Sequence, residues 1–207
     1  MKLIIENQIL APIYVFSEFL RSDLVIIEKF DTFQKRTFRN RFFILSDKGP
    51  QMISIPLQKG KNHLLFEEVL ISYDMDWVKV LINTLKTNYG SSPFFEHYFD
   101  SLCDIFNAKF EYLFDLNNAL RDFLLSSLDI ELKIEYSDSY INNYSDVEDL
   151  RDYILPSNFN EDKFLSNVTY NQVFEFKGGF VPNLSVIDLL FNRGKYGFQI
   201  LSDYPSK

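Results

Sequence analysis

The sequence has only one cysteine, Cys103, and two histidines, His63 and His97, among its 207 residues. A disulfide framework and a cysteine-based zinc site are therefore excluded. A histidine metal centre or a Ser-His-Asp triad would have to use one of these two histidines, and neither has a nucleophile beside it in the sequence. We therefore assign neither histidine a catalytic role and expect no metal site.

Long apolar runs and the common cofactor-binding motifs are also absent. No stretch approaches the about 18 apolar residues of a membrane span, and Glu6, Asn7 and Gln8 interrupt the apolar start before it could form a signal peptide. We therefore expect a cytoplasmic protein with no membrane span. The sequence contains no P-loop and no G-x-G-x-x-G, G-x-S-x-G or H-E-x-x-H motif, so it identifies no cofactor.

Basic residues are fewer than acidic ones: the sequence has 21 Lys and Arg residues and 29 Asp and Glu residues, which gives a net charge of -8. A negative field of this size opposes binding to nucleic acid or to anionic membranes, so we expect no nucleic-acid partner. Only 7 Gly and 7 Pro are present, which argues against low-complexity disorder. Aromatic residues are abundant instead, and the length predicts one domain that spans residues 1–207.

The first 27 residues have the pattern of a βαβ unit. Residues 2–5 form a short apolar run, residues 13–20 carry Phe16, Phe19 and Leu20 at helical spacing, and residues 24–27 form a second apolar run. Two strands joined by a helix are typical of parallel pairing.

Further elements interleave along the chain. We expect strands at residues 38–45, 52–56, 132–136 and 168–176. We expect helices at residues 78–89 after Asp76, from Ser92-Pro93 to Phe106, from Asp115 to Leu128, at residues 145–154 after a Ser145–Glu148 capping box, and from Ser185 to Gly194. This order predicts an α/β fold with a mixed or parallel sheet and a central helical block, with α+β as the alternative.

A basic segment, residues 34–41, places four cations within eight residues of an acidic chain. Arginine presents a planar fork that matches phosphate or carboxylate. If the segment is a strand, Lys35, Arg39 and Arg41 share one face. One interpretation is an anion site for a phosphorylated or carboxylated substrate; the other is a set of surface cations that pair with surplus Asp and Glu. The candidate substrate-binding residues here are Gln34, Lys35, Arg36, Asn40 and Arg41.

A second segment begins at Gln172 and includes a helix start after a Pro-Asn turn. Such a helix N-terminus can bind an anion, and Asn183 and Ser185 could add hydrogen bonds. The alternative is structural: Ser185 caps the helix and Asp188 complements its dipole. The candidate residues are Gln172, Asn183, Ser185, Asp188 and Asn192.

The loop after the first strand is a third candidate, because α/β proteins tend to place ligands there. Gln8 could contact a substrate or simply satisfy loop backbone groups. Asp23, Glu28 and Asp31 surround the second strand, where a carboxylate could act as a base or a metal ligand. The alternative is that these carboxylates cap a turn or pair with Arg36 or Arg41.

Taken together, these segments resemble the WbqC-like family. The resemblance is carried by Asp23, Trp77 and Gly194, and by residues 33–41, 44, 53–56, 89–95, 172–174 and 179–192. They run in the family's order over nearly the whole chain. The combination of Asn40-Arg41 after Gln34-Lys35 with the later Pro-Asn-Leu-Ser-x-x-Asp-Leu-Leu-Phe-Asn run is specific.

The resemblance implies a bacterial protein linked to surface-polysaccharide synthesis, including O-antigen synthesis, and a role in transferring an aminoacyl group such as glycine to a sugar. It raises the rank of eight residues as site candidates: Gln34, Lys35, Asn40, Arg41, Asn183, Ser185, Asp188 and Asn192. Relatives often have a histidine where this chain has Leu81. If that histidine is a general base, this chain lacks it.

Two functional hypotheses follow. In the first, the protein is a transferase in which the basic segment binds phosphate, Asp188 or Asp23 polarises a hydroxyl or amine, and preorganised donors stabilise the transition state. In the second, it is a non-catalytic binding or assembly protein that uses the same cleft.

Overall fold

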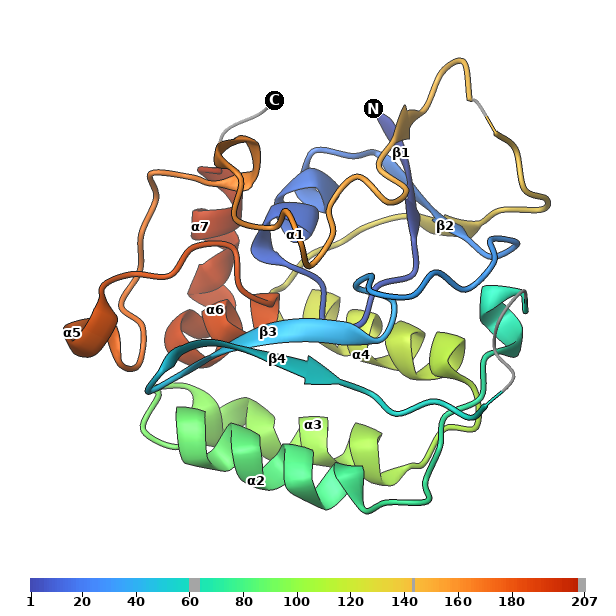
Figure 1. Cartoon of the computed structure of the whole chain (residues 1–207). Coiled ribbons are helices and arrows are strands. Elements are labelled where there is room, and N and C mark those ends of the chain that lie inside the picture. Colours follow the sequence, from blue (N-terminus) through green and yellow to red (C-terminus); the bar gives the residue numbers. More distant parts are fainter. Residues whose placement is uncertain (60–63, 143, 205–207) are drawn as a thin grey trace.

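The structure is a computed structural model that describes residues 1–59, 64–142 and 144–204. Figure 1 shows a β-hairpin across the middle of the molecule, helices α2 and α3 on one side of it, and a parallel sheet with helix α1 on the other. The fold is α/β with a four-stranded sheet and a separate two-stranded sheet. The predicted fold class is confirmed.

The βαβ unit forms as predicted. Strand β1 (Lys2–Glu6) is followed by helix α1 (Ile13–Leu20) and strand β2 (Leu24–Glu28), and β1 and β2 pair in parallel. All but one of the α1 residues are buried, because the helix covers a sheet face that is apolar on both strands. The register pairs Glu6 with Glu28, so both strands end in a glutamate at the same edge.

Two short strands complete the parallel sheet. Strand β5 (Ile134–Tyr136) pairs with β2, and strand β6 (Glu148–Asp149) pairs with the other side of β1, which gives the order β5-β2-β1-β6. β2 and β5 therefore lie on one side of β1 and β6 lies on the other, so the strand order reverses between β1 and β6. The helix predicted at residues 145–154 is wrong, because the amide of Leu150 donates to the carbonyl of Ile4 and the segment joins the sheet.

The hairpin consists of strand β3 (Arg41–Ser46) and strand β4 (Gly49–Ser54) in antiparallel pairing. The predicted start at residue 38 is wrong, since residues 35–40 form turns. The carbonyl of Phe38 accepts from the amide of Ile9, and the carbonyl of Arg39 accepts from the side chain of Asn117. Long-range partners replace the strand ladder there, so the proposed alternation of side chains over residues 34–41 does not exist.

The helical block is confirmed as α2 (Trp77–Tyr89), α3 (Phe95–Asn107) and α4 (Leu113–Ser127). Asp76 caps α2 as predicted, but Ser92 and Asp115 cap nothing. The amide of Phe94 instead donates to the carbonyl of Phe191, and the amide of Leu113 donates to the carbonyl of Val69. Tertiary hydrogen bonds set these helix starts, which local capping signals could not reveal.

The C-terminal region contains α5 (Glu175–Gly178), α6 (Val186–Arg193) and α7 (Gly197–Ser202). Three single-turn helices complete the fold: η1 (Phe66–Glu68), η2 (Asp162–Phe164) and η3 (Gly194–Tyr196). The predicted helix from Ser185 is confirmed, with the Ser185 side chain accepting from the amide of Ile187. The strand predicted at 168–176 is wrong, because that segment is irregular and enters α5 through a left-handed Phe174. Within the described ranges, no helix combines the length and apolar character needed to cross a bilayer.

Replacing Gly194 by alanine should destabilise the fold by about 1–3 kcal/mol. Gly194 ends α6 with a φ of 59°, and an added Cβ would lie 2.6 Å from the ring of Phe94. Urea denaturation followed by circular dichroism measures the loss. Gly178→Ala is the matched control, because nothing lies within 4 Å of its added Cβ. Equal stabilities for the two variants would contradict the packing described here.

Candidate functional site

The carboxyl edge of the parallel sheet is the candidate site. In α/β proteins ligands bind outside the carboxyl ends of strands, at the point where the strand order reverses. Here that point lies between β1, which ends at Glu6, and β6, which is followed by Arg151 and Asp152. Glu6 and Glu28 are almost completely buried at this edge, which is unusual for carboxylates.

Arg39 gathers three carboxylates from different segments, and we call Glu6, Asp31, Arg39 and Asp152 the Arg39 cluster. One guanidinium nitrogen lies 2.6 Å from Asp152 Oδ1, and another pairs with Asp31. The side chain of Arg39 is 0% exposed, whereas that of Asp152 is 44% exposed. Burial lowers the pKa of Arg39, but the charges of Glu6, Asp152 and Asp31 outweigh burial and hold that pKa above its ordinary value. The guanidinium of Arg39 therefore interacts with carboxylates of the protein itself.

Glu6 is the most deeply buried carboxylate of the cluster. Its Oε1 accepts from Gln8 Nε2 at 2.6 Å, and its Oε2 accepts from the backbone amide of Asp152 at 2.9 Å. Burial raises the pKa of Glu6 above its ordinary value, although the charge of Arg39 opposes the shift. A carboxyl group whose pKa moves toward the working pH is a better general acid or base.

Arg151 holds the segment after β5 against the carboxyl edge of the sheet. It pairs with Glu28 at 2.9 Å and with Asp149 at 2.7 Å. Its guanidinium also lies over the rings of Tyr140 and Tyr144, at 4.8 Å and 5.5 Å. These contacts hold the long connection between β5 and β6 against β2.

An inner cavity of about 10 Å³ adjoins Glu6, between strands β1 and β2 and helices α1 and α4. Gln8 and Arg121 line it together with apolar side chains such as Ile5 and Phe16. Gln8 Oε1 and Arg121 Nε are both buried, and neither has a hydrogen-bond partner among the described residues. Unpaired buried polar atoms are rare in folded proteins, so these two mark the cavity as a candidate for ligand binding.

The remaining cations of the basic segment do not take part in the ion pairs of the Arg39 cluster. Gln34, Lys35 and Arg36 are exposed on the turn that leads into Arg39, and Arg36 has a φ of 63°. Lys35, Arg36 and the half-buried Arg41 form no ion pair with any described residue. Asn40 is buried and donates to the carbonyl of Ile55. The segment thus divides into an exposed cationic turn and a buried structural half.

Asp188 occupies a closed environment of its own. It is 0% exposed and accepts from Tyr89 Oη at 2.7 Å, Tyr170 Oη at 2.6 Å and Gln172 Nε2 at 2.9 Å. Burial raises the pKa of Asp188, and the three donors oppose that rise. We call these four residues the Asp188 cluster. The cluster explains Asp188 as a structural link between α6 and α2, and its catalytic role stays a prediction without geometric support.

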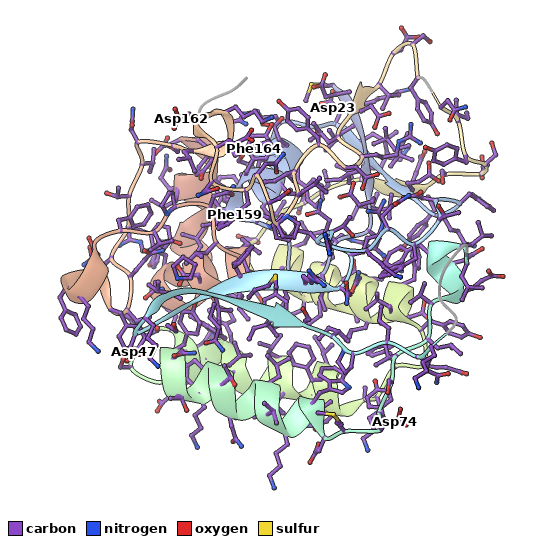
Figure 2. All side chains as sticks on the ribbon, viewed as in Figure 1. Asp23, Asp47, Asp74, Phe159, Asp162 and Phe164 are labelled. Carbon is purple, nitrogen blue, oxygen red and sulfur yellow. The ribbon has the colours of Figure 1, made fainter. Side chains whose placement is uncertain are left out.

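Asn183 and Ser185 serve the loop that follows β1. Asn183 Oδ1 accepts from the amide of Tyr14 at 2.9 Å and so caps α1, while its Nδ2 donates to the carbonyl of Phe159. Figure 2 shows Phe159 above the hairpin, where its ring stacks on that of Phe43 with centroids 4.3 Å apart. Ser185 forms a β-bridge with Pro12. Residues 8–14 are therefore where the N-terminal loop, the basic segment and the C-terminal motif meet.

Asp23 lies apart from the other candidates. It precedes β2 at the amino edge of the sheet, its side chain is 88% exposed, and it pairs with the amino group of Met1. Figure 2 shows it at the top of the molecule, away from the hairpin. Asn192 is also separate from the carboxyl edge, since it donates to the carbonyl of Asp188 inside α6. The geometry gives no support for an active site shared by Asp23 and Asp188.

Sequence reasoning did not select Glu6, Arg39, Asp152 or Arg121. One signal was present: both β1 and β2 are apolar runs that end in glutamate, at Glu6 and Glu28. Parallel pairing makes such strand ends neighbours. Arg121 gave no signal, because it lies on α4, far along the chain. His97 is exposed on α3, and His63 lies outside the described residues.

Asp188→Asn should reduce the free energy of unfolding by about 2–3 kcal/mol. The NH2 group of the new amide would face side chains that donate hydrogen bonds to Asp188 in the wild type. Thermal or urea unfolding measures the loss. Asp74→Asn, at an exposed position, is the control and should change stability by no more than about 0.5 kcal/mol. A native-like Asp188→Asn variant would contradict the structural role.

Glu6→Gln should gain stability relative to the wild type as pH rises. The pKa of Glu6 is raised above 4.5 in the folded state, so the folded wild type binds a proton that the unfolded chain has already lost. Its unfolding free energy therefore falls as pH rises through the raised pKa. Glutamine has no such proton. Denaturation from about pH 4 to about pH 8 tests the difference, and parallel curves for the two proteins would contradict it.

Comparisons with known proteins agree with the resemblance seen in the sequence. The profile of the WbqC-like protein family matches residues 12–200. The chain is similar to the uncharacterized protein Rv1507c of Mycobacterium tuberculosis (strain ATCC 25618 / H37Rv), with 29% identity over 188 residues that cover 78% of this chain and 80% of the relative. No solved structure matches the chain. The chain belongs to the WbqC-like protein family.

Proposed function

We propose that the carboxyl edge of the parallel sheet binds a phosphorylated or carboxylated sugar, and that the protein is a transferase of bacterial surface-polysaccharide synthesis. Transfer of an aminoacyl group such as glycine to the sugar is the reaction that the family resemblance favours. The observation that carries the proposal is Glu6, a buried carboxyl group with a raised pKa at the end of the central strand β1.

Glu6 would act as general base toward the acceptor group of the substrate. Its pKa is shifted toward the range in which a carboxylate can take a proton and return it. Gln8 donates to it and would keep its orientation during the reaction. Asp152 donates a backbone amide to the other oxygen and also borders solvent, so the site lies at the protein surface on that side.

Lys35 and Arg36 would attract the phosphate or carboxylate. Both are exposed and neither pairs with a carboxylate of the described chain. They stand on the turn that leads into Arg39, whose guanidinium interacts electrostatically with Glu6. In a chain of net charge -8, two exposed cations on one turn form a local positive field that favours an anion.

A second candidate function is non-catalytic binding or assembly in the same pathway. The favouring observation is that the Arg39 cluster is complete without a ligand: Arg39 is surrounded by three carboxylates, and both oxygens of Glu6 already accept hydrogen bonds. Such a site would bind through the exposed cationic turn and leave Glu6 as a structural group.

A thermal-shift screen of nucleotides, nucleotide-sugars, acyl carriers and amino acids should identify a stabilising phosphorylated ligand. At about 100 times its dissociation constant a ligand adds roughly 2.7 kcal/mol to stability, which is a shift of several degrees. The double variant Lys35→Ala/Arg36→Ala should lose the shift. Lys79→Ala/Lys86→Ala removes the same charge from exposed positions on α2 and should keep it.

The reaction itself separates the two candidate functions. With the ligand found, mass spectrometry of the products should show group transfer by the wild type and at least about a hundredfold slower transfer by Glu6→Gln, with binding retained. Binding without turnover by the wild type would favour the non-catalytic function. A screen in which no phosphorylated ligand shifts the midpoint would reject the proposal.

A further inference from the structure

Arg121 is shared by two hollows at the carboxyl edge. It lines the inner cavity with Glu6 and Gln8. Its guanidinium also donates to Asn118 Oδ1 at 2.9 Å and to Tyr136 Oη at 3.3 Å. Those two acceptors line an open surface groove of about 430 Å³, which we call the outer groove. Arg121 is thus the polar wall between the inner cavity and the outer groove.

The inner cavity is a built polar site inside an apolar shell. Gln8 is 7% exposed and Arg121 is 6% exposed. Gln8 Nε2 donates to Glu6, so its amide orientation is set and Oε1 remains as an unpaired acceptor. Arg121 Nε remains as an unpaired donor. Both residues line the cavity, so one unpaired acceptor and one unpaired donor belong to a lining that is otherwise mostly aliphatic and aromatic.

We propose that the inner cavity recognises a hydroxyl group of a ligand that enters from the outer groove when Arg121 moves aside. A hydroxyl donates one hydrogen bond and accepts others, so it offers both the donor that Gln8 Oε1 lacks and the acceptor that Arg121 Nε lacks. The volume of about 10 Å³ matches a group the size of one water molecule. A larger ligand would keep the rest of its body in the outer groove.

Other head groups fit this pair of atoms poorly. An ammonium group has only donors, so it would leave Arg121 Nε unpaired. A carboxylate has only acceptors, so it would meet Gln8 Oε1 acceptor to acceptor. Two carboxylates, Glu67 and Asp115, and one lysine, Lys29, line the outer groove. This excess of negative charge disfavours an anionic ligand body there.

Recognition of a hydroxyl goes beyond the proposed function, because it requires neither a phosphate nor a transfer step. It also involves different side chains from the cationic turn of Lys35 and Arg36. The two ideas can therefore fail separately.

Ethanol, ethylammonium and acetate are probes of similar size that carry the three head groups. We expect ethanol to perturb the NMR signals of the Gln8 side-chain amide and of Arg121 Nε–H, with an affinity at least about fivefold above the other two probes, the factor that one hydrogen bond contributes. Gln8→Met keeps the length of the side chain and removes the acceptor, together with the donor to Glu6. It should weaken ethanol binding by about fivefold to tenfold.

Gln199→Met, at an exposed position on α7, is the control and should bind ethanol as the wild type does. Arg121→Met should abolish the preference for ethanol and speed its exchange, because the donor and the wall are both removed. Circular dichroism verifies that each variant is folded. Equal affinity for the three probes, no binding of ethanol by the wild type, or unchanged ethanol binding by Gln8→Met would each overturn the inference.

Discussion

The buried charge of Arg39 is the constraint on which the carboxyl edge depends. A guanidinium with no solvent contact is stable only when carboxylates surround it, and three segments supply them: Glu6 from the end of β1, Asp31 from the loop after β2, and Asp152 from the turn after β6. Because these segments are far apart in sequence, the cluster brings the strand ends into a common edge. Loss of Asp31 would leave one guanidinium nitrogen of Arg39 without its carboxylate partner.

Two buried carboxylates show how position decides what a group can do. Asp188 is enclosed by three side-chain donors, one from α2 and two from the irregular segment before α5, and it joins α6 to α2 and to β3 through Tyr89. Glu6 is equally buried, but its neighbour Gln8 still has an unpaired acceptor and lies in a cavity. The donors around Asp188 pair with it in a closed cluster, whereas Gln8, the neighbour of Glu6, has an oxygen that still lacks a hydrogen-bond donor. That difference places the candidate chemistry at Glu6.

The segments that resemble the WbqC-like family contribute mainly to the frame around residues 8–14. Asn183 caps α1, Ser185 pairs with Pro12, and Phe38 accepts from Ile9. Each holds the loop that carries Gln8 and follows Glu6. A family motif can therefore be specific because it builds the support of a site, even where its polar side chains are themselves hydrogen-bonded to the protein.

The sequence by itself determined the βαβ unit, the three central helices and the capped α6, because each is encoded by local periodicity and by signals within a few residues. It also singled out the run of cations at residues 34–41. Only the tertiary structure decided the rest. Arg39 and Arg41 are two positions apart in the sequence, yet one is buried among carboxylates and the other has no charged partner among the described residues. β6 is a strand because β1 offers it an edge, and Arg121 lines the same cavity as Gln8 only because the fold brings α4 to the end of β1. Such contacts join residues more than a hundred positions apart, and no local pattern encodes them.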